Sequence, residues 1–143
     1  MSNEEKDLLL KDLCARLPYG VKVQAISVYG YTVQVHIEGY CSSNNKFYID
    51  LRWRTLDEFK PYLRPMSSMT DEEREEWADL FNLELDKLNE IDDENKAEDL
   101  APYYFGKSHQ VSIDWLNTYH FDYRGLIPMG LALEAPKDMY KID

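Results

Sequence analysis

The sequence is poor in the residues that stabilise small secreted domains or form metal and nucleotide sites. Its 143 residues include two cysteines, three histidines and six glycines. Cys14 and Cys41 show no CxxC spacing, and small secreted domains usually carry more cysteines, so a reducing compartment is favoured. The dispersed histidines lack the spacing of metal ligands, and no GxGxxG or GxxxxGK[ST] loop occurs. We therefore expect no metal and no cofactor.

Long apolar runs are also absent. No segment approaches the roughly 20 apolar residues of a membrane span. The N-terminal stretch MSNEEKDLLLKDLCARL has neither the basic start nor the apolar centre of a signal peptide. The sequence thus predicts a cytoplasmic protein with no membrane contact.

Positive charge is scarce in one segment. From Asp71 to Asp99, fourteen acidic residues accompany three basic ones, and this stretch accounts for the whole formal net charge of −11. An acidic segment repels phosphate backbones, so direct nucleic-acid binding is not expected. Three interpretations stay open: a solvated helix face, a docking surface for a basic protein, or an inhibitor in which residues 71–99 mimic nucleic-acid phosphates.

The apolar pattern of the first half predicts a helix followed by strands. Leucines recur at helical spacing over residues 4–17, with Ser2 or Asn3 as the cap. The segments VKVQAISV, YTVQVHIEGY and KFYIDLRWR, within about residues 21–54, alternate apolar and polar residues as strands do. We predict a single α+β domain over 1–143, in which helices pack on one face of an antiparallel β-meander.

Two details of the meander follow from the pattern. The apolar positions of the first strand change face at Ala25 and Ile26, which indicates a bulge. A regular second hairpin would place Glu38 opposite Lys46 and Thr32 opposite Arg52.

The second half is expected to be mainly helical. Pro61 and Pro65 interrupt the crossover after the strands. Thr70 and Glu73 form a capping box for a helix reaching residue 91, although Asn82 or Asn89 could divide it. The stretch 92–102 is expected to be a mobile acidic connection.

The chain end combines a short helix with an apolar tail. Ser112 is expected to cap a helix ending near Phe121, and LIPMGLALEAP is expected to enter the core as an extended segment or last strand.

The segment Tyr119–Gly130 holds the strongest candidates for chemistry. His120 and Asp122 could form an oriented acid–base pair in a hydrolase-like enzyme, but no serine or cysteine stands in a nucleophile motif. The alternative is a structural corner, in which aromatic rings are buried and Arg124 pairs with Asp122 or Asp114. We favour the corner.

Two groups of residues are candidates for binding. The first group is Arg52, Trp53 and Arg54 on the expected sheet. The second is Tyr123 and Arg124, where a guanidinium can stack on an aromatic ring.

Three stretches, LLLKDLCARLPYGV, KPYLRPMSSMT and WLNTYHFDYRGLIPMGLALEAP, resemble blocks of a family of small uncharacterised proteins from gut bacteria, their phages and mobile elements. The resemblance implies a bacterial or phage setting and supplies no catalytic residue. Together with the residue patterns, it favours a non-enzymatic accessory or interaction protein with a protein partner.

Overall fold

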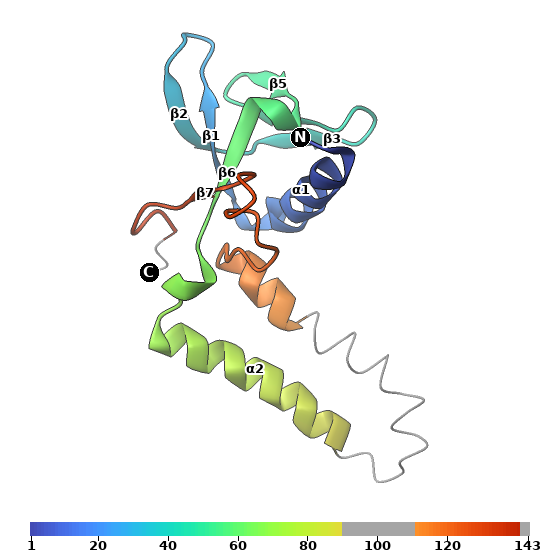
Figure 1. The fold of residues 1–143 in the computed structure, drawn as a ribbon, viewed down its shortest axis with the longest axis vertical. Coiled ribbons are helices and arrows are strands. Elements are labelled where there is room, and N and C mark those ends of the chain that lie inside the picture. Colours follow the sequence, from blue (N-terminus) through green and yellow to red (C-terminus); the bar gives the residue numbers. More distant parts are fainter. Residues whose placement is uncertain (90–110, 141–143) are drawn as a thin grey trace. The chain divides into compact units, whose positions relative to one another are not determined.

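The computed structural model describes residues 1–89 and 111–140, which belong to two compact units. One unit comprises Met1–Met66 with Asn117–Asp143, and the other comprises Ser67–Leu116. Figure 1 shows the course of the chain from the N-terminal helix to the last strand. The single-domain organisation inferred from the sequence stays a prediction.

Helix α1 (Asn3–Arg16) begins at the expected cap. The Ser2 hydroxyl accepts the Glu5 N–H at 3.1 Å, and the Glu5 carboxylate accepts the Ser2 N–H at 3.0 Å. These two bonds satisfy backbone donors that the first helical turn would leave unpaired. A 3-10 turn over Leu17–Tyr19 follows, as Pro18 prevents the α-helix from continuing.

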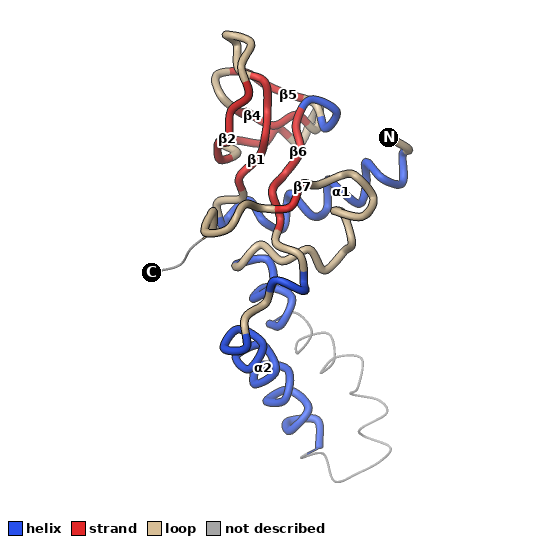
Figure 2. The backbone as a smooth tube through the Cα atoms, turned by 60° about the vertical axis from the view of Figure 1, so that its left-hand side comes forward, coloured by secondary structure: helices blue, strands red, loops and turns tan. Residues whose placement is uncertain are grey.

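Four strands form the larger sheet, in the order β2-β1-β6-β7. Strands β1 (Lys22–Ile26) and β2 (Thr32–His36) form an antiparallel hairpin, and β6 (Phe59–Leu63) pairs with the other side of β1. The short strand β7 (Leu133–Glu134) adds parallel to β6, which confirms that the apolar tail supplies a last strand. Figure 2 shows these strands in red.

Three shorter strands form a second antiparallel sheet, in the order β3-β4-β5. They are β3 (Gly39–Cys41), β4 (Lys46–Ile49) and β5 (Arg52–Arg54). The α+β class and the meander are therefore confirmed, whereas the division of the strands into two sheets was not predicted.

The expected pairing of the second hairpin is wrong. Tyr40 lies opposite Phe47, and Cys41 lies opposite Lys46, so the expected partner of Lys46 is displaced by three residues. Thr32 pairs with Ile26 of β1 instead of Arg52.

The predicted single strand over KFYIDLRWR is also interrupted. Asp50 and Leu51 have φ angles of 46° and 70°, and these left-handed residues turn the chain back between β4 and β5. Leu51 and Trp53 are exposed as a result, while Arg54 is buried. The alternation of residue types continues through the turn, so it concealed the reversal.

The bulge predicted in the first strand does not form. Strand β1 pairs residue by residue with β2 from Lys22 to Ile26. Val23, Ala25 and Ser27 all face the interior, and Ile26 points to solvent. The apolar residue at 26 is therefore an outward side chain on a regular strand.

Pro61 lies inside β6, not at a break. The bonds from Ser27 N–H to the Tyr31 carbonyl and from Ile37 N–H to the Val21 carbonyl show that odd-numbered residues of β1 bond to β2. Even-numbered residues of β1 therefore face β6, so the missing N–H of Pro61, which lies opposite Val23, points away from β1.

The core of the first unit is formed by α1 and both sheets. Its buried side chains come from the helix, the strands, the segments that join them and the C-terminal segment. They are Leu9, Leu13, Val21, Val23, Ala25, Phe47, Ile49, Leu56, Phe59, Leu63, Leu126, Leu131 and Ala132. The 3-10 turn Leu56–Glu58 joins β5 to β6.

The second unit contains α2 (Asp71–Asn89), preceded by the 3-10 turn Met66–Ser68. The capping box is confirmed, because Thr70 and Glu73 exchange bonds of 3.0 and 3.1 Å. The helix passes Asn82 without a break. The expected acidic connection 92–102 lies outside the described residues.

A last helix covers residues 111–118. Ser112 lies within this helix and is buried, so its predicted role as a cap is wrong. The helix also ends before Phe121. His120, with φ of 62°, follows it in the left-handed conformation often found just after helices.

Candidate functional site

The segment after the last helix runs beside the end of β6. Arg64 donates its N–H to the His120 carbonyl, and Asp122 donates its N–H to the Arg64 carbonyl, both at 2.8 Å. Phe121, between them, is fully buried, and the Arg64 guanidinium carbon lies 4.2 Å from its ring centre. This backbone pairing fixes where the neighbouring side chains point.

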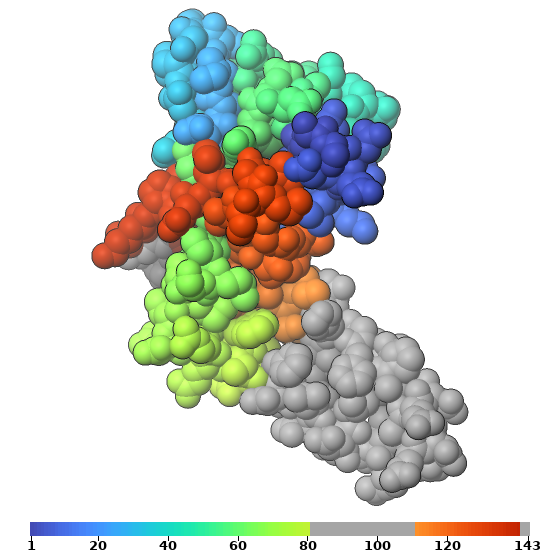
Figure 3. Space-filling model, in the orientation of Figure 1, coloured from blue at the N-terminus to red at the C-terminus, as the bar shows by residue number. Residues whose placement is uncertain are grey.

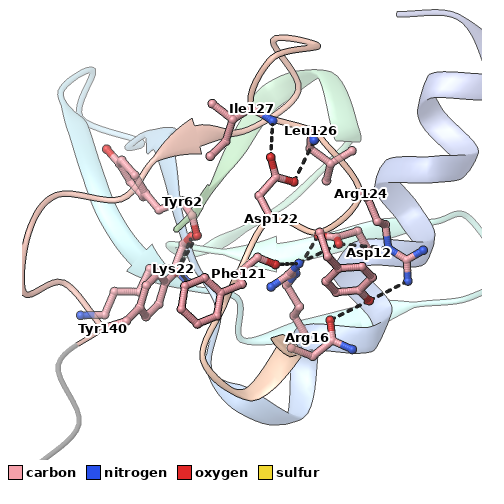
Figure 4. Close-up of polar contacts among 12 residues, drawn as sticks. Asp12, Arg16, Lys22, Tyr62, Phe121, Asp122, Arg124, Leu126, Ile127 and Tyr140 are labelled. Carbon is pink, nitrogen blue, oxygen red and sulfur yellow. Dashed lines mark hydrogen bonds and ion pairs between the residues drawn. The ribbon is translucent and has the colours of Figure 1, made fainter. Parts of the chain in front are cut away.

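Asp122 closes the corner. Its two carboxylate oxygens accept the N–H groups of Leu126 and Ile127 at 2.8 and 2.9 Å. Gly125, at φ of 75°, lets the chain reverse between the carboxylate and those amides. Figure 4 shows both bonds, in which Asp122 stabilises the turn as an acceptor for backbone groups.

A buried ionic cluster joins this corner to α1. Asp12 and Arg16 are both fully buried and form a two-point pair at 2.8 and 3.0 Å. Arg16 also donates to the Phe121 carbonyl at 2.6 Å, and Arg124 donates to Asp12 at 3.2 Å. The carboxylate therefore has two guanidinium partners, and the expected pairing of Arg124 with Asp122 or Asp114 is wrong.

Tyr123 completes the cluster. Its hydroxyl donates to the Asn117 side chain and accepts from Arg124, both at 3.0 Å. The guanidinium carbons of Arg124 and Arg16 lie 4.9 and 5.4 Å from its ring centre. The predicted contact between Arg124 and an aromatic ring is present, and both side chains are partly buried.

His120 lies on the other side of the corner, against the C-terminal segment. Its ring stacks on Tyr140, with centres 4.0 Å apart and an angle of 27° between the planes. Burial lowers the pKa of His120 to about 4, and the positive charge of Arg16 acts in the same direction. The imidazole is therefore neutral near pH 7.

The Tyr140 hydroxyl replaces a missing bond of the sheet. It accepts the Lys22 N–H at 2.7 Å and donates to the Tyr62 carbonyl at 2.8 Å. Lys22 and Tyr62 are the next facing pair beyond the β1–β6 ladder, where direct backbone bonds would otherwise form. Burial raises the pKa of Tyr140 well above its usual value, so the hydroxyl keeps its proton.

These contacts give His120 and Asp122 structural roles. His120 is 4% exposed, and both oxygens of Asp122 are occupied by backbone amides. A pocket of about 320 Å³ in the same unit is lined by neither residue; its lining includes Leu9, Leu56 and Phe59. Among the side chains that the structure describes, no group of three or more histidine, cysteine or acidic residues is placed to hold a metal ion.

The binding candidates on the second sheet are in different environments. Arg52 is exposed. Trp53 is half exposed, and the centre of its ring lies 5.3 Å from the centre of the Tyr48 ring. Arg54 is fully buried and donates to the Ile49 carbonyl at 2.9 Å. Arg52 and Trp53 are therefore accessible to a partner, and Arg54 supports the fold.

The sequence did not single out the exposed apolar side chains at the tip of the β1–β2 hairpin. We define the hairpin tip as four side chains: Ile26 (49% exposed), Val28 (46%), Tyr29 (77%) and Tyr31 (58%). Figure 3 shows this hairpin, in light blue, at the surface of its unit. The change of face at Ile26 was the available signal, and it was interpreted as a bulge.

The acidic segment is described only in part. On the first turns of α2, five acidic side chains are exposed, namely Asp71, Glu72, Glu75, Glu76 and Asp79. Residues 81–99 of the predicted surface lie beyond the described side chains. Its proposed roles in docking or inhibition stay predictions.

No protein-family model, curated protein or solved structure matches this chain. Within the part of the chain that the structure describes, no helix has the length and hydropathy needed to span a membrane.

Proposed function

We propose that this chain is a non-enzymatic protein-interaction module of the cytoplasm that binds a partner protein through the hairpin tip. The observation that carries the proposal is the gathering of four exposed apolar side chains at one turn. Two of them, Tyr29 and Tyr31, stack on one another, and tyrosine is enriched among the residues that dominate binding energy.

The hairpin tip is also ordered. Ser27 holds the turn, since its side-chain oxygen accepts the Tyr29 N–H at 3.1 Å and its carbonyl accepts the Gly30 N–H at 3.0 Å. The rings of Tyr29 and Tyr31 stack with centres 6.2 Å apart and planes 11° from parallel. A surface that is already ordered loses less conformational entropy on binding, so the tip is suited to recognition.

The tip matches an apolar recess on the partner. The unit that carries it contains twelve acidic and twelve basic residues, so it has no formal net charge. Attraction between charged surfaces therefore gives little of the binding energy, and burial of rings and aliphatic groups gives most of it. An origin in a phage or mobile element, implied by the family resemblance, stays a prediction.

The hydrolase alternative has less support. An acid–base pair must reach a substrate, whereas His120 is stacked on Tyr140 and Asp122 is bonded to two amides. We therefore do not assign a reaction to this segment.

Site-specific photocrosslinking in the native host tests the proposal. A benzophenone amino acid at Tyr29 should give a discrete crosslinked protein band. The same probe at Met129, which is 45% exposed on another loop, is the matched control and should not give that band.

A second variant tests the energetic role of the tip. Tyr29→Ser should abolish capture of the crosslinked protein while thermal unfolding stays unchanged, because the ring is 77% exposed. Equal capture by Tyr29→Ser and the parent chain would exclude the tip as the binding surface.

A further inference from the structure

Strand β2 is an edge of the larger sheet, and its outer side is open. Odd-numbered residues of β1 bond to odd-numbered residues of β2, as where Val23 faces Val35. The N–H and C=O groups of Thr32, Gln34 and His36 therefore point away from β1. Among residues 1–89 and 111–140, no strand pairs with that side, and Figure 1 shows β2 outermost in the sheet.

This edge lacks the features by which proteins usually prevent edge-to-edge pairing. The sequence of β2, TVQVH, contains no lysine, no proline and no acidic residue, and its pairing with β1 contains no bulge. The other edges are shorter or charged. Strand β7 has two residues and ends at Glu134, β5 consists of Arg52, Trp53 and Arg54, and β3 has three residues.

The open side of β2 is complementary to itself. In an antiparallel pairing about Gln34, Thr32 of one copy lies opposite His36 of the other, and Gln34 lies opposite Gln34 of the second copy. The three outward N–H groups of each strand then meet the three outward carbonyls of its partner. All of the edge groups are satisfied, and the arrangement has the twofold symmetry most common in homodimers.

The side chains support the same register. Val33, Val35 and Ile37 pack against the core but are only partly buried, because the sheet ends beside them. Pairing about Gln34 places Val33 opposite the second copy's Val35 and Tyr31 opposite its Ile37. These are the β-branched and aromatic pairs that stabilise neighbouring strands, and they would cover the 58% exposed ring of Tyr31.

Charge does not oppose this contact. The unit that contains β2 has no formal net charge, and the whole formal charge of −11 belongs to residues 67–116. The strand itself holds no lysine, arginine, aspartate or glutamate. A second copy of this chain therefore matches the open edge of β2 in both its backbone polar groups and its side chains.

We propose that two copies of this chain pair antiparallel through β2, centred on Gln34, and join their four-stranded sheets into one continuous sheet. This pairing goes beyond the proposed function. It involves the outer edge of β2 instead of the hairpin tip, and a second copy of this chain instead of a foreign protein. Tyr29, at the turn, lies outside the paired strand.

Sedimentation velocity over a concentration series of the full chain gives the first test. The parent chain should show a reversible monomer–dimer equilibrium. Gln34→Pro removes an outward N–H and should weaken the dimer by about 10- to 100-fold, the effect expected when two symmetric hydrogen bonds are lost. Gln34→Ala also removes the side-chain bond to the Tyr62 hydroxyl but keeps the N–H, so it should dimerise like the parent chain.

Charge exchange at the symmetry axis gives the second test and does not need proline. Gln34→Glu and Gln34→Lys each place like charges opposite one another and should weaken the homodimer about fivefold. An equimolar mixture of the two variants should restore dimer formation at low salt, and high salt should reduce that recovery.

Three results would overturn the pairing: a parent chain that stays monomeric, a dimer that tolerates Gln34→Pro, or charge variants that do not recover on mixing. Val28→Ser separates this proposal from the proposed function: Val28 belongs to the hairpin tip, lies outside the paired strand and has no ring to stack on Tyr31, so the variant should leave dimerisation unchanged while it weakens partner capture. A normal dimer with no captured partner would therefore reject the proposed function alone.

Discussion

The buried cluster around Asp12 gives the sharpest test of how this fold is held together. Asp12→Ala removes the carboxylate that accepts two bonds from Arg16 and one from Arg124. Arg124 is 23% exposed and can turn to water, whereas Arg16 is fully buried and keeps one hydrogen bond, to the Phe121 carbonyl, and its contact with the Tyr123 ring. Leaving a buried charge without its partner costs about 3–5 kcal/mol, a large part of a typical stability of about 5–15 kcal/mol.

Urea unfolding followed by tryptophan fluorescence measures this cost, and a double variant shows its origin. Arg16→Met removes the buried charge while it keeps an apolar side chain of similar length. Asp12→Ala combined with Arg16→Met should therefore be more stable than Asp12→Ala alone by at least about 1 kcal/mol. A cost of Asp12→Ala below about 1 kcal/mol, or a double variant less stable than Asp12→Ala, would show that Asp12 does not compensate a buried charge on Arg16.

The remaining predictions concern the corner. In the unfolded chain, His120 binds a proton once the pH falls below the ordinary histidine pKa of 6.5, whereas in the folded chain it does so only near its lowered pKa of about 4. The free energy of unfolding should therefore fall by about 3 kcal/mol as the pH decreases from 6.5 to about 4. Asn tolerates the positive φ, so His120→Asn should flatten the pH profile of urea unfolding, and an unchanged profile would contradict the assignment. Tyr140→Phe should cost about 1–3 kcal/mol and speed hydrogen exchange at the Lys22 amide; an unaltered exchange rate would show that the hydroxyl does not bridge Lys22 and Tyr62. Asp122→Ala should cost about 2 kcal/mol in a thermal melt, and Asp122→Asn, which keeps one acceptor, should cost less; equal costs would exclude the two-amide role.

Local chemistry made several elements predictable. The helix caps at Ser2 and Thr70 depend on residues three positions apart, so the sequence contains all the information they require. The β1–β2 hairpin follows from alternation on both sides of a glycine turn. The corner could also be predicted, because Tyr119–Gly130 combines aromatic rings, a carboxylate and a glycine at spacings that suit a chain reversal.

Distant contacts determined what the sequence could not predict. Asp12 and Arg16 are four residues apart on α1 and could equally have been a solvated pair. Their burial depends on the Phe121 carbonyl, 105 residues beyond Arg16, and on Arg124, 112 residues beyond Asp12. Tyr140 gave no local signal either, since its hydroxyl acts 118 residues away at Lys22.

Two strand errors have a related cause. Alternation reports which side chains could share a face, but it does not report where the backbone adopts a positive φ, as it does at Asp50. Pro61 was interpreted as a break because the direction of its missing N–H depends on the registration of β1. The hairpin tip was overlooked for the same reason, since Ile26 is outward only when the strand is regular.

The unit built on α1 and β1 is completed by residues 117–140, which the ribosome adds after everything else in the unit. During translation, Arg16 can pair at once with Asp12 on its own helix, but its bond to the Phe121 carbonyl and the bond from the Lys22 amide to Tyr140 form only after those residues are added. The early part of the nascent chain therefore emerges without its final packing. Any protein that assists its maturation would meet an open sheet and an Asp12–Arg16 pair that still lacks its contacts with Phe121 and Arg124 until synthesis of the last strand ends.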